Sequence, residues 1–165
     1  MSLRTTLSEF RKKSYSERDK GDRFERLMAD YLRTDPNYSY KFKQVWLWNG
    51  FPGRKDLGGS DTGIDLVAQT HAGDYWAIQC KCYAEGARIE KKHVDSFLAT
   101  SSRTFLDNGL KTVGFSHRLW IDTTGKRWSA NAEEAIRNQR IPVSRIGLFQ
   151  LEEARIKEDK RLVDL

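Results

Sequence analysis

Residues 63–83 read GIDLVAQTHAGDYWAIQCKCY, and this stretch predicts the centre of the fold. Two largely apolar runs, Ile64–Thr70 and Tyr75–Tyr83, are separated by a short segment, His71–Asp74, that contains glycine and aspartate. Such spacing and composition are typical of two antiparallel strands joined by a tight turn. The sequence therefore predicts a β-hairpin here.

Polar residues interrupt both predicted strands at positions that can meet. Residues two apart in a strand point to the same face, so Gln79 and Lys81 lie together. In the first strand, Ile64 and Leu66 are expected to share a face and leave Asp65 on the opposite one. Pairing of the strands then places a carboxylate, an amide and an ammonium group together at one edge of the sheet.

Oxygen ligands in this arrangement suit Mg²⁺, which binds one or two protein carboxylates and keeps several waters. We expect Asp65 and Gln79 to hold the ion and the backbone carbonyl of Cys80 to add a further oxygen. Lys81 would then lie beside a metal-bound water and stabilise negative charge on a phosphate. The pattern predicts a centre for phosphodiester hydrolysis.

Other readings of these residues stay open at this stage. Asp61 lies four residues before Asp65 and is an alternative ligand or a loop residue. Cys80 and Cys82 lack the spacing of a structural zinc site, so we expect two core cysteines. His93 begins the next predicted helix, where it could contact a phosphate or be an ordinary exposed residue.

The flanking sequence predicts helices and further strands around the hairpin. A helix from Glu17 to Arg33 carries apolar residues at helical spacing, namely Phe24, Leu27, Met28, Tyr31 and Leu32. The remaining predicted elements are a strand at 40–48, a helix at 90–104, a strand at 111–123, a helix at 131–140 and a strand at 145–151. This order predicts an α/β fold with a mixed central sheet. We divide the chain into a basic N-terminal arm or loose helix (1–16), a main domain (17–151) and a charged tail or start of a linker to a further module (152–165).

Composition narrows the class of partner. The 165 residues include 29 Lys and Arg against 23 Asp and Glu, for a net charge of +6, and an acidic partner such as nucleic acid is expected. No apolar run approaches the ~20 residues needed to cross a bilayer, and no secretory signal is recognisable. We therefore expect a cytoplasmic protein with no membrane partner. The phosphate-binding motif of nucleotide motors is missing, so we expect no bound nucleotide.

The spacing of these residues resembles a known nuclease motif. Asp65, followed fourteen residues later by Gln79-Cys80-Lys81, resembles the D…QxK variant of the PD-(D/E)xK motif found in Mrr-like restriction endonucleases. That family also carries an F-E pair on an upstream helix, which Phe24-Glu25 resembles. The resemblance covers about residues 21–122. It implies a restriction-endonuclease-like fold, in which a mixed sheet is flanked by helices.

The resemblance also implies roles for individual residues. Asp65, Gln79, Lys81 and Glu25 would be catalytic, and Asp65, Gln79 and Cys80 would bind Mg²⁺, for which Mn²⁺ can substitute. The implied activity is cleavage of double-stranded DNA, with a transient dimer cutting both strands. Three alternatives remain: a repair or junction-resolving nuclease of the same fold, a DNA-binding module without catalysis, and a structural platform for a helicase in which cutting is secondary.

A narrower resemblance concerns the aromatic segment before residue 58 and the sequence after Trp128. Both look like the N-terminal nuclease of single-chain ATP-dependent restriction enzymes. In those enzymes the nuclease is joined to helicase and methyltransferase modules, and this chain carries the motifs of neither. The implied role is the cleavage module of a larger restriction-modification enzyme.

Overall fold

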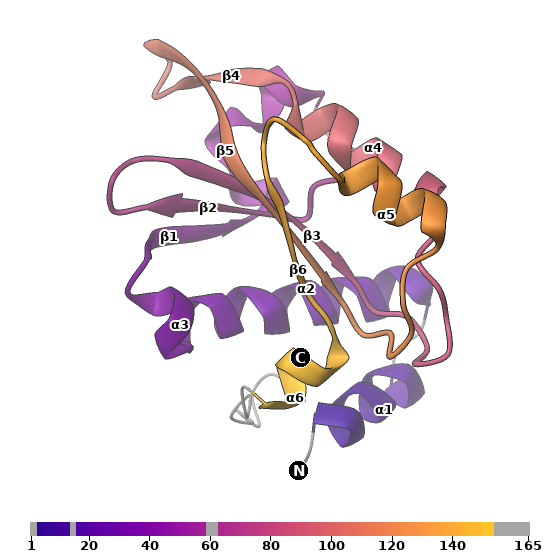
Figure 1. Cartoon of the computed structure of the whole chain (residues 1–165). Helices are drawn as coiled ribbons and strands as arrows, with labels where there is room; N and C mark the ends of the chain where they lie inside the picture. The colour runs from indigo at the N-terminus through magenta and orange to yellow at the C-terminus, as the bar shows by residue number, and fades with distance from the viewer. Residues whose placement is uncertain (1–2, 14–15, 59–62, 154–165) are drawn as a thin grey trace.

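The computed structural model describes residues 3–13, 16–58 and 63–153. The alternative ligand Asp61 therefore lies outside the described residues. Within them, six strands form one mixed sheet in the order β1-β2-β3-β5-β4, with β6 also paired to β5 (Figure 1). The strands are β1 Phe42–Leu47, β2 Leu66–Thr70, β3 Tyr75–Lys81, β4 Thr104–Asp107, β5 Lys111–Asp122 and β6 Val143–Ile146.

The predicted hairpin is the antiparallel pair β2 and β3, and β1 adds to it in antiparallel fashion. The direction changes at β5, which runs parallel to β3 on one side and to β6 on the other. Parallel neighbours need a crossover connection, and helix α4 (Lys91–Ser101) supplies it between β3 and the β4–β5 hairpin. The predicted mixed sheet is therefore confirmed.

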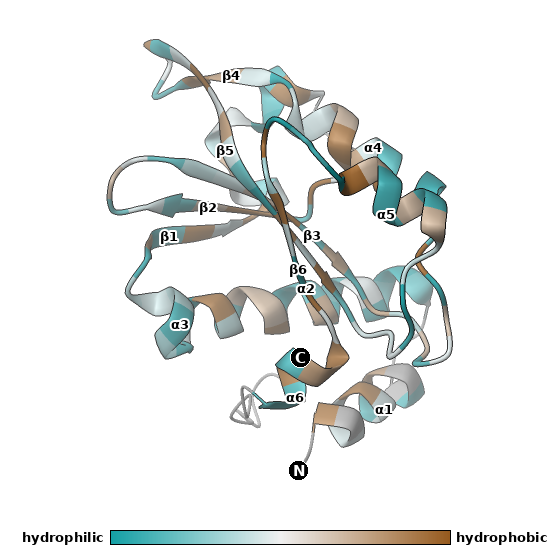
Figure 2. Cartoon of the chain, viewed as in Figure 1, coloured by the Kyte–Doolittle hydropathy of each residue, from teal (hydrophilic) through white to brown (hydrophobic). Residues whose placement is uncertain are grey.

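Helices cover both faces of this sheet (Figure 1). The helices α1 Leu3–Lys13, α2 Glu17–Thr34, α3 Pro36–Ser39 and α6 Leu148–Glu153 lie on one side. On the other side lie α4 and α5 (Ala130–Ile136), together with two short 3-10 turns at Trp48–Gly50 and Pro52–Leu57. Figure 2 shows hydrophobic colouring along β3 and mixed colouring on α4 and α5, as expected for a buried strand between amphipathic helices.

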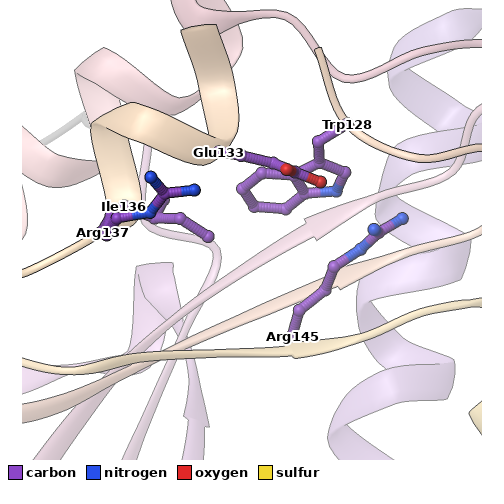
Figure 3. Close-up of a pocket in the computed structure, with 5 residues that line it drawn as sticks. All are labelled: Trp128, Glu133, Ile136, Arg137 and Arg145. Atoms are coloured by element: carbon purple, nitrogen blue, oxygen red, sulfur yellow. The ribbon is translucent and has the colours of Figure 1, made fainter. Parts of the chain in front are cut away.

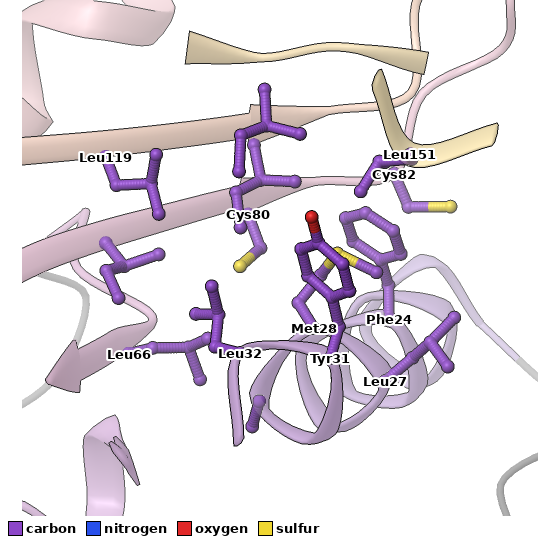
Figure 4. Packing of buried hydrophobic residues seen from close by; sticks show 14 of the residues in the cluster. Phe24, Leu27, Met28, Tyr31, Leu32, Leu66, Cys80, Cys82, Leu119 and Leu151 are labelled. Carbon is purple, nitrogen blue, oxygen red and sulfur yellow. The ribbon is translucent and has the colours of Figure 1, made fainter. Parts of the chain in front are cut away.

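Helix α2 forms as its sequence pattern predicts. Ser16 caps its N-terminus by accepting a hydrogen bond from the backbone N–H of Asp19 at 3.0 Å. The apolar positions on α2 are all buried against β2, β3 and β5, where they meet Leu66, Cys80 and Leu119 (Figure 4). Each such side chain contributes about 1.5–3 kcal/mol when it is removed from water. This packing fixes α2, and with it Glu25, against the sheet.

A second apolar cluster fills the space between the sheet and α4 and α5. It is aromatic in character: Phe97 meets Trp120 with ring centroids 5.8 Å apart, and Trp120 meets Trp128 at 5.3 Å. All three rings are buried. The central strands β2 and β3 are therefore covered on both faces.

The N-terminal segment is a helix packed on the domain, neither a free arm nor a loose helix. Residues 3–13 form α1, in which Leu3, Leu7 and Phe10 are buried in the same cluster as α2. Their spacing of i, i+4 and i+7 places them on one face of a helix. The basic residues between them obscured this pattern in the sequence.

Two further predictions need correction. The strand expected at 145–151 is β6 at Val143–Ile146 followed by α6, whose Leu148 and Leu151 are buried. The packed domain therefore reaches Glu153, beyond the expected boundary at 151. The short strand β4 was also missed; it begins at Thr104, the last residue of the predicted helix, and continues to Asp107. Among the described residues, no helix combines the length and the apolar character needed to cross a membrane.

Candidate active site

Asp65 lies just before β2, and its backbone is held on both sides. Its N–H donates to the carbonyl of Ile78 at 2.9 Å, and its carbonyl accepts from the N–H of Trp48 at 2.9 Å. Gly63 precedes it with a φ of 78°, a left-handed conformation that favours glycine. A Cβ on Gly63 would lie 2.9 Å from the Ser96 hydroxyl oxygen. The local sequence therefore fixes where Asp65 enters the sheet.

The carboxylate of Asp65 accepts two hydrogen bonds from the neighbouring strand. Its Oδ2 lies 2.7 Å from Nε2 of Gln79 and 2.8 Å from the backbone nitrogen of Cys80. Gln79 is only 2% exposed. The expected approach of Asp65 to Gln79 is therefore observed, and both donors orient the same carboxylate oxygen.

One detail of the predicted alternation is wrong. Leu66 lies in the cluster under α2, whereas Ile64 is buried in the cluster under α4. The regular strand begins only at Leu66, so the period of two does not extend back to Ile64. Asp65 occupies the transition into the strand, and its side chain turns along the sheet edge toward Gln79.

Glu25 reaches the same place from α2. Its carboxyl group lies within hydrogen-bonding reach of the Asp65 carboxyl group. Burial, the negative charge of Asp65 and the hydrogen bond between them raise the pKa of Glu25 to about 9, and Lys81 opposes the shift. Burial also raises the pKa of Asp65, against the hydrogen bonds from Cys80 and Glu25 and the charge of Lys81. Near neutral pH the two carboxyl groups therefore share a proton.

Asp22 is a third acidic residue near this pair, and sequence reasoning did not single it out. Its charge helps to raise the pKa values of both Glu25 and Asp65. It is exposed and lies three residues before Glu25 on α2, a spacing that places both on one helix face. That spacing is the signal that could have identified it.

Lys81 is the last residue of β3 and is half-buried. Its ammonium group favours the charged forms of both Asp65 and Glu25. Gln79 lies two residues earlier in the same strand, on the same face. The structure thus brings together all four side chains that the sequence proposed: Glu25, Asp65, Gln79 and Lys81.

These residues fit a hard divalent cation. The Oε1 atom of Gln79 is buried and has no hydrogen-bond partner among the described residues. The Cys80 N–H and the Ile78 carbonyl both point toward Asp65, so strand geometry directs the Cys80 carbonyl to that edge too. No group of three or more His, Cys, Asp or Glu side chains suited to a metal occurs in the described part of the chain. The available donors are therefore a carboxylate, an amide and a main-chain oxygen, which suit Mg²⁺.

The cysteines do not contribute thiols to this site. Cys80 and Cys82 are both buried in the cluster under α2, as expected for core residues (Figure 4). Burial and the nearby carboxylates raise the pKa of the Cys80 thiol, which keeps it protonated and unreactive. Cys80 therefore acts at this site through its backbone.

His93 is part of the α4 cap. Its Nδ1 accepts a hydrogen bond from the backbone nitrogen of Glu90 at 2.9 Å, and the Glu90 side chain accepts from the N–H of His93. Its ring contacts that of Tyr83 at 5.6 Å between centroids. Burial and the charges of Lys92 and Lys81 lower its pKa. The observed contacts thus give His93 a capping role.

A separate pocket lies between α5 and β6 (Figure 3). It has a volume of about 320 Å³ and is lined by Trp128, Glu133, Ile136, Arg137 and Arg145. The Arg145 guanidinium lies 5.0 Å from the centre of the Trp128 ring and bonds the buried carboxylate of Asp122. None of the four side chains gathered at Asp65 lines this pocket.

Comparison with known proteins places the chain in a family. A model of Mrr-type catalytic domains, described as restriction endonuclease, matches residues 33–164. The ATP-dependent Type ISP restriction-modification enzyme LlaBIII, solved bound to DNA, is 29% identical, with a TM-score of 0.61 over 78% of this chain. The curated proteins include no match to this sequence.

Two further solved structures share the fold at lower identity. The DNA modification-dependent restriction endonuclease AspBHI is 13% identical, with a TM-score of 0.56 over 98% of this chain. MspJI restriction endonuclease, in complex with a 27-mer oligonucleotide, is 18% identical, with a TM-score of 0.51 over 92%. The chain spans only 7% of LlaBIII, 37% of AspBHI and 30% of MspJI. The restriction-endonuclease-like fold is confirmed, and the chain belongs to the Mrr-type restriction endonuclease family as a nuclease domain.

Proposed function

We propose that this domain is a Mg²⁺-dependent DNA endonuclease whose catalytic residues are Asp65, Gln79, Lys81 and Glu25. The observation that carries the proposal is the convergence on Asp65. Its Oδ2 accepts from Gln79 and Cys80, while Glu25 and Lys81 lie within electrostatic reach. Two carboxyl groups with raised pKa values beside a lysine, at the end of a sheet, are typical of a catalytic site rather than of a structural ion pair.

Asp65, the Oε1 atom of Gln79 and the backbone carbonyl of Cys80 would hold the ion, and Mn²⁺ would substitute for Mg²⁺. A bound divalent cation would polarise a phosphoryl oxygen and lower the pKa of a coordinated water. Support for this role comes from the buried, unpartnered Oε1 of Gln79. Asp65 needs no reorientation, because its backbone and one carboxylate oxygen are already fixed.

The chain's own residues supply the rest of the chemistry. The Lys81 ammonium group would orient the attacking water and stabilise the negative charge that develops on the phosphate. Glu25 would hydrogen-bond water in the outer shell once the cation has displaced its proton. Its pKa of about 9 means that it carries this proton at neutral pH when no cation is bound.

Double-stranded DNA is the proposed substrate, since the domain carries a net charge of +6. Arg88, Lys91 and Lys92 are exposed and lie between the end of β3 and the first turn of α4. We propose that they contact DNA phosphates near the active site, contacts that position DNA without reading its sequence. One active site cuts one strand, so we propose that two domains meet transiently to cut both.

We further propose that the domain is the cleavage module of a larger restriction-modification enzyme. The similarity to LlaBIII, an ATP-dependent enzyme of which this chain spans 7%, supports this view. Helicase and methyltransferase modules would then drive and direct cleavage. Helicase motifs encoded downstream in the same reading frame would support the proposal, and a stop codon directly after residue 165 would contradict it.

Nicking of supercoiled plasmid in Mg²⁺ or Mn²⁺ tests the active site. We expect Asp65→Ala and Lys81→Ala to lower the nicking rate by about 10²–10⁴-fold, the usual loss for an acid–base or charge-stabilising group. Lys111→Ala is the matched control, because Lys111 is exposed at the opposite end of β5. Equal nicking by all variants would identify a contaminant. Tight DNA binding with no nicking by the wild type would favour a binding module.

A further inference from the structure

The backbone that carries Lys81 lies at the end of the regular strand pairing. On one side, β2 pairs with β3 only as far as Leu66 opposite Ile78. On the other side, the last pair between β3 and β5 joins Lys81 to Asp122. Lys81 is therefore the last residue of β3, where its backbone pairing with β2 has already ended and its pairing with β5 ends.

Side chains and one backbone N–H continue the hydrogen bonding where the regular strand pairing ends. On the β2 side, the Asp65 carboxylate accepts from the N–H of Cys80. On the β5 side, Thr123 donates its backbone N–H to the carbonyl of Lys81 at 3.2 Å. Its hydroxyl oxygen then accepts from the Tyr83 N–H at 2.8 Å and donates to the Tyr83 carbonyl at 2.6 Å. Thr123 is 1% exposed, so these bonds are shielded from water.

The residue before Thr123 is itself firmly anchored. The carboxylate of Asp122 is fully buried and accepts hydrogen bonds from Thr124, from the Trp128 indole and from Arg145. Thr123 is therefore a rigid support, and its hydroxyl imposes one position on the backbone of residues 81–83.

We infer that Thr123 is a positioning residue for Lys81, setting the placement of the lysine ammonium group through three hydrogen bonds to the backbone of residues 81 and 83. This inference rests on the proposed catalytic role of Lys81. A small tilt of the backbone at Lys81 is amplified along its long side chain, and misplacement of a catalytic group by about 1 Å can lower the rate by about 10²-fold. The side chain at position 123 must carry a hydroxyl, because it accepts from the N–H of Tyr83 and donates to the carbonyl of Tyr83.

The test compares two substitutions at this position. Thr123→Val has almost the same shape and keeps the backbone hydrogen bond to the Lys81 carbonyl, but it loses both hydroxyl hydrogen bonds to Tyr83. Thr123→Ser keeps the hydroxyl. With plasmid DNA and Mg²⁺, we expect the valine variant to lose about 10–100-fold in kcat with KM unchanged within twofold. We expect the serine variant to stay within about threefold of wild type. The pH profile of kcat should shift in the valine variant alone, because Lys81 moves relative to Asp65 and Glu25.

A second variant separates positioning from general stability. Ser101→Ala removes another buried hydroxyl, which donates to the Phe97 carbonyl and accepts from Arg118. We expect it to lower Tm while leaving kcat unchanged below the melting transition. Wild-type kcat and pH profile in Thr123→Val, with Lys81→Ala inactive, would overturn the inference. So would equal losses in the valine and serine variants that follow Tm alone. If Lys81→Ala stays active, the proposed role of Lys81 fails, and the role of Thr123 fails with it.

Discussion

The carboxyl groups of Glu25 and Asp65 meet although one comes from the middle of α2 and the other from the segment that enters β2. Packing of α2 on the sheet forces the approach, since its flanking residues Phe24 and Met28 are fully buried. Two carboxylates within hydrogen-bonding reach of each other repel when both are ionised. The arrangement is stable when a proton or a cation lies between them.

The first prediction concerns pH and stability. The pKa of Glu25 is about 9 in the folded protein against 4.5 in a free side chain. The folded state thus binds more protons than the unfolded state between these values, so the contribution of Glu25 to stability is fully present below pH 4.5 and declines as pH rises toward 9. We expect the contribution of this pair to lower Tm steadily from pH 5 to pH 9 without metal. Glu25→Gln should flatten that dependence in a thermal-shift series, and an unchanged slope would contradict the shared proton.

The second prediction concerns metal binding. A divalent cation binds ionised carboxylates, so it must displace the proton that Glu25 and Asp65 share. We expect Mg²⁺ to raise Tm more at pH 8.5 than at pH 6.0 and to release protons on binding. Calorimetry in two buffers of different ionisation enthalpy measures this release. Asp65→Asn should abolish both effects, whereas Asp95→Asn, on the exposed side of α4, should abolish neither.

The third prediction concerns Gln79, which now donates a hydrogen bond to Asp65. Gln79→Glu removes this donor and adds a negative charge beside two carboxyl groups. We expect the metal-free variant to melt at lower temperature than wild type above pH 7, and Mg²⁺ to restore most of the loss. Gln79→Leu should instead lose Mg²⁺ binding without regaining Tm. Identical responses of the two variants to Mg²⁺ would show that position 79 does not contact the ion.

The sequence predicted the hairpin, the mixed sheet and α2 because each depends on a local pattern. Alternation and a turn mark the hairpin, and helical spacing marks α2. The approach of Asp65 to Gln79 followed from strand pairing. What the sequence could not indicate depends on tertiary contacts. Helix α1 is stabilised by burial of Leu3, Leu7 and Phe10 rather than by a strong local signal.

The contacts of Thr123 belong to the same class of feature. A threonine at the end of a strand has no sequence signature that distinguishes it from others. Its hydroxyl contacts residue 83, forty positions earlier in the chain. Likewise, the residues that hold Arg118 come from α4 and from the turn before β6. Hydrogen bonds between residues this far apart in the sequence can be identified only in the folded structure.

The last prediction concerns Arg118, which is 1% exposed and donates to no carboxylate of the described residues. Its guanidinium instead donates to five neutral oxygens, those of Ser101, Ser102, Gln139 and the carbonyls of Leu98 and Ile141. It thereby ties the end of α4 to the segment before β6. Arg118→Met fills a similar volume but leaves these acceptors unsatisfied, so we expect a loss of about 2–4 kcal/mol in the free energy of unfolding. Urea denaturation measures that loss. Nicking per folded molecule should remain at the wild-type rate, because Arg118 lies on the opposite face of the sheet from Glu25. A fall in kcat at temperatures where the variant is folded would show that the contacts of Arg118 also affect the active site.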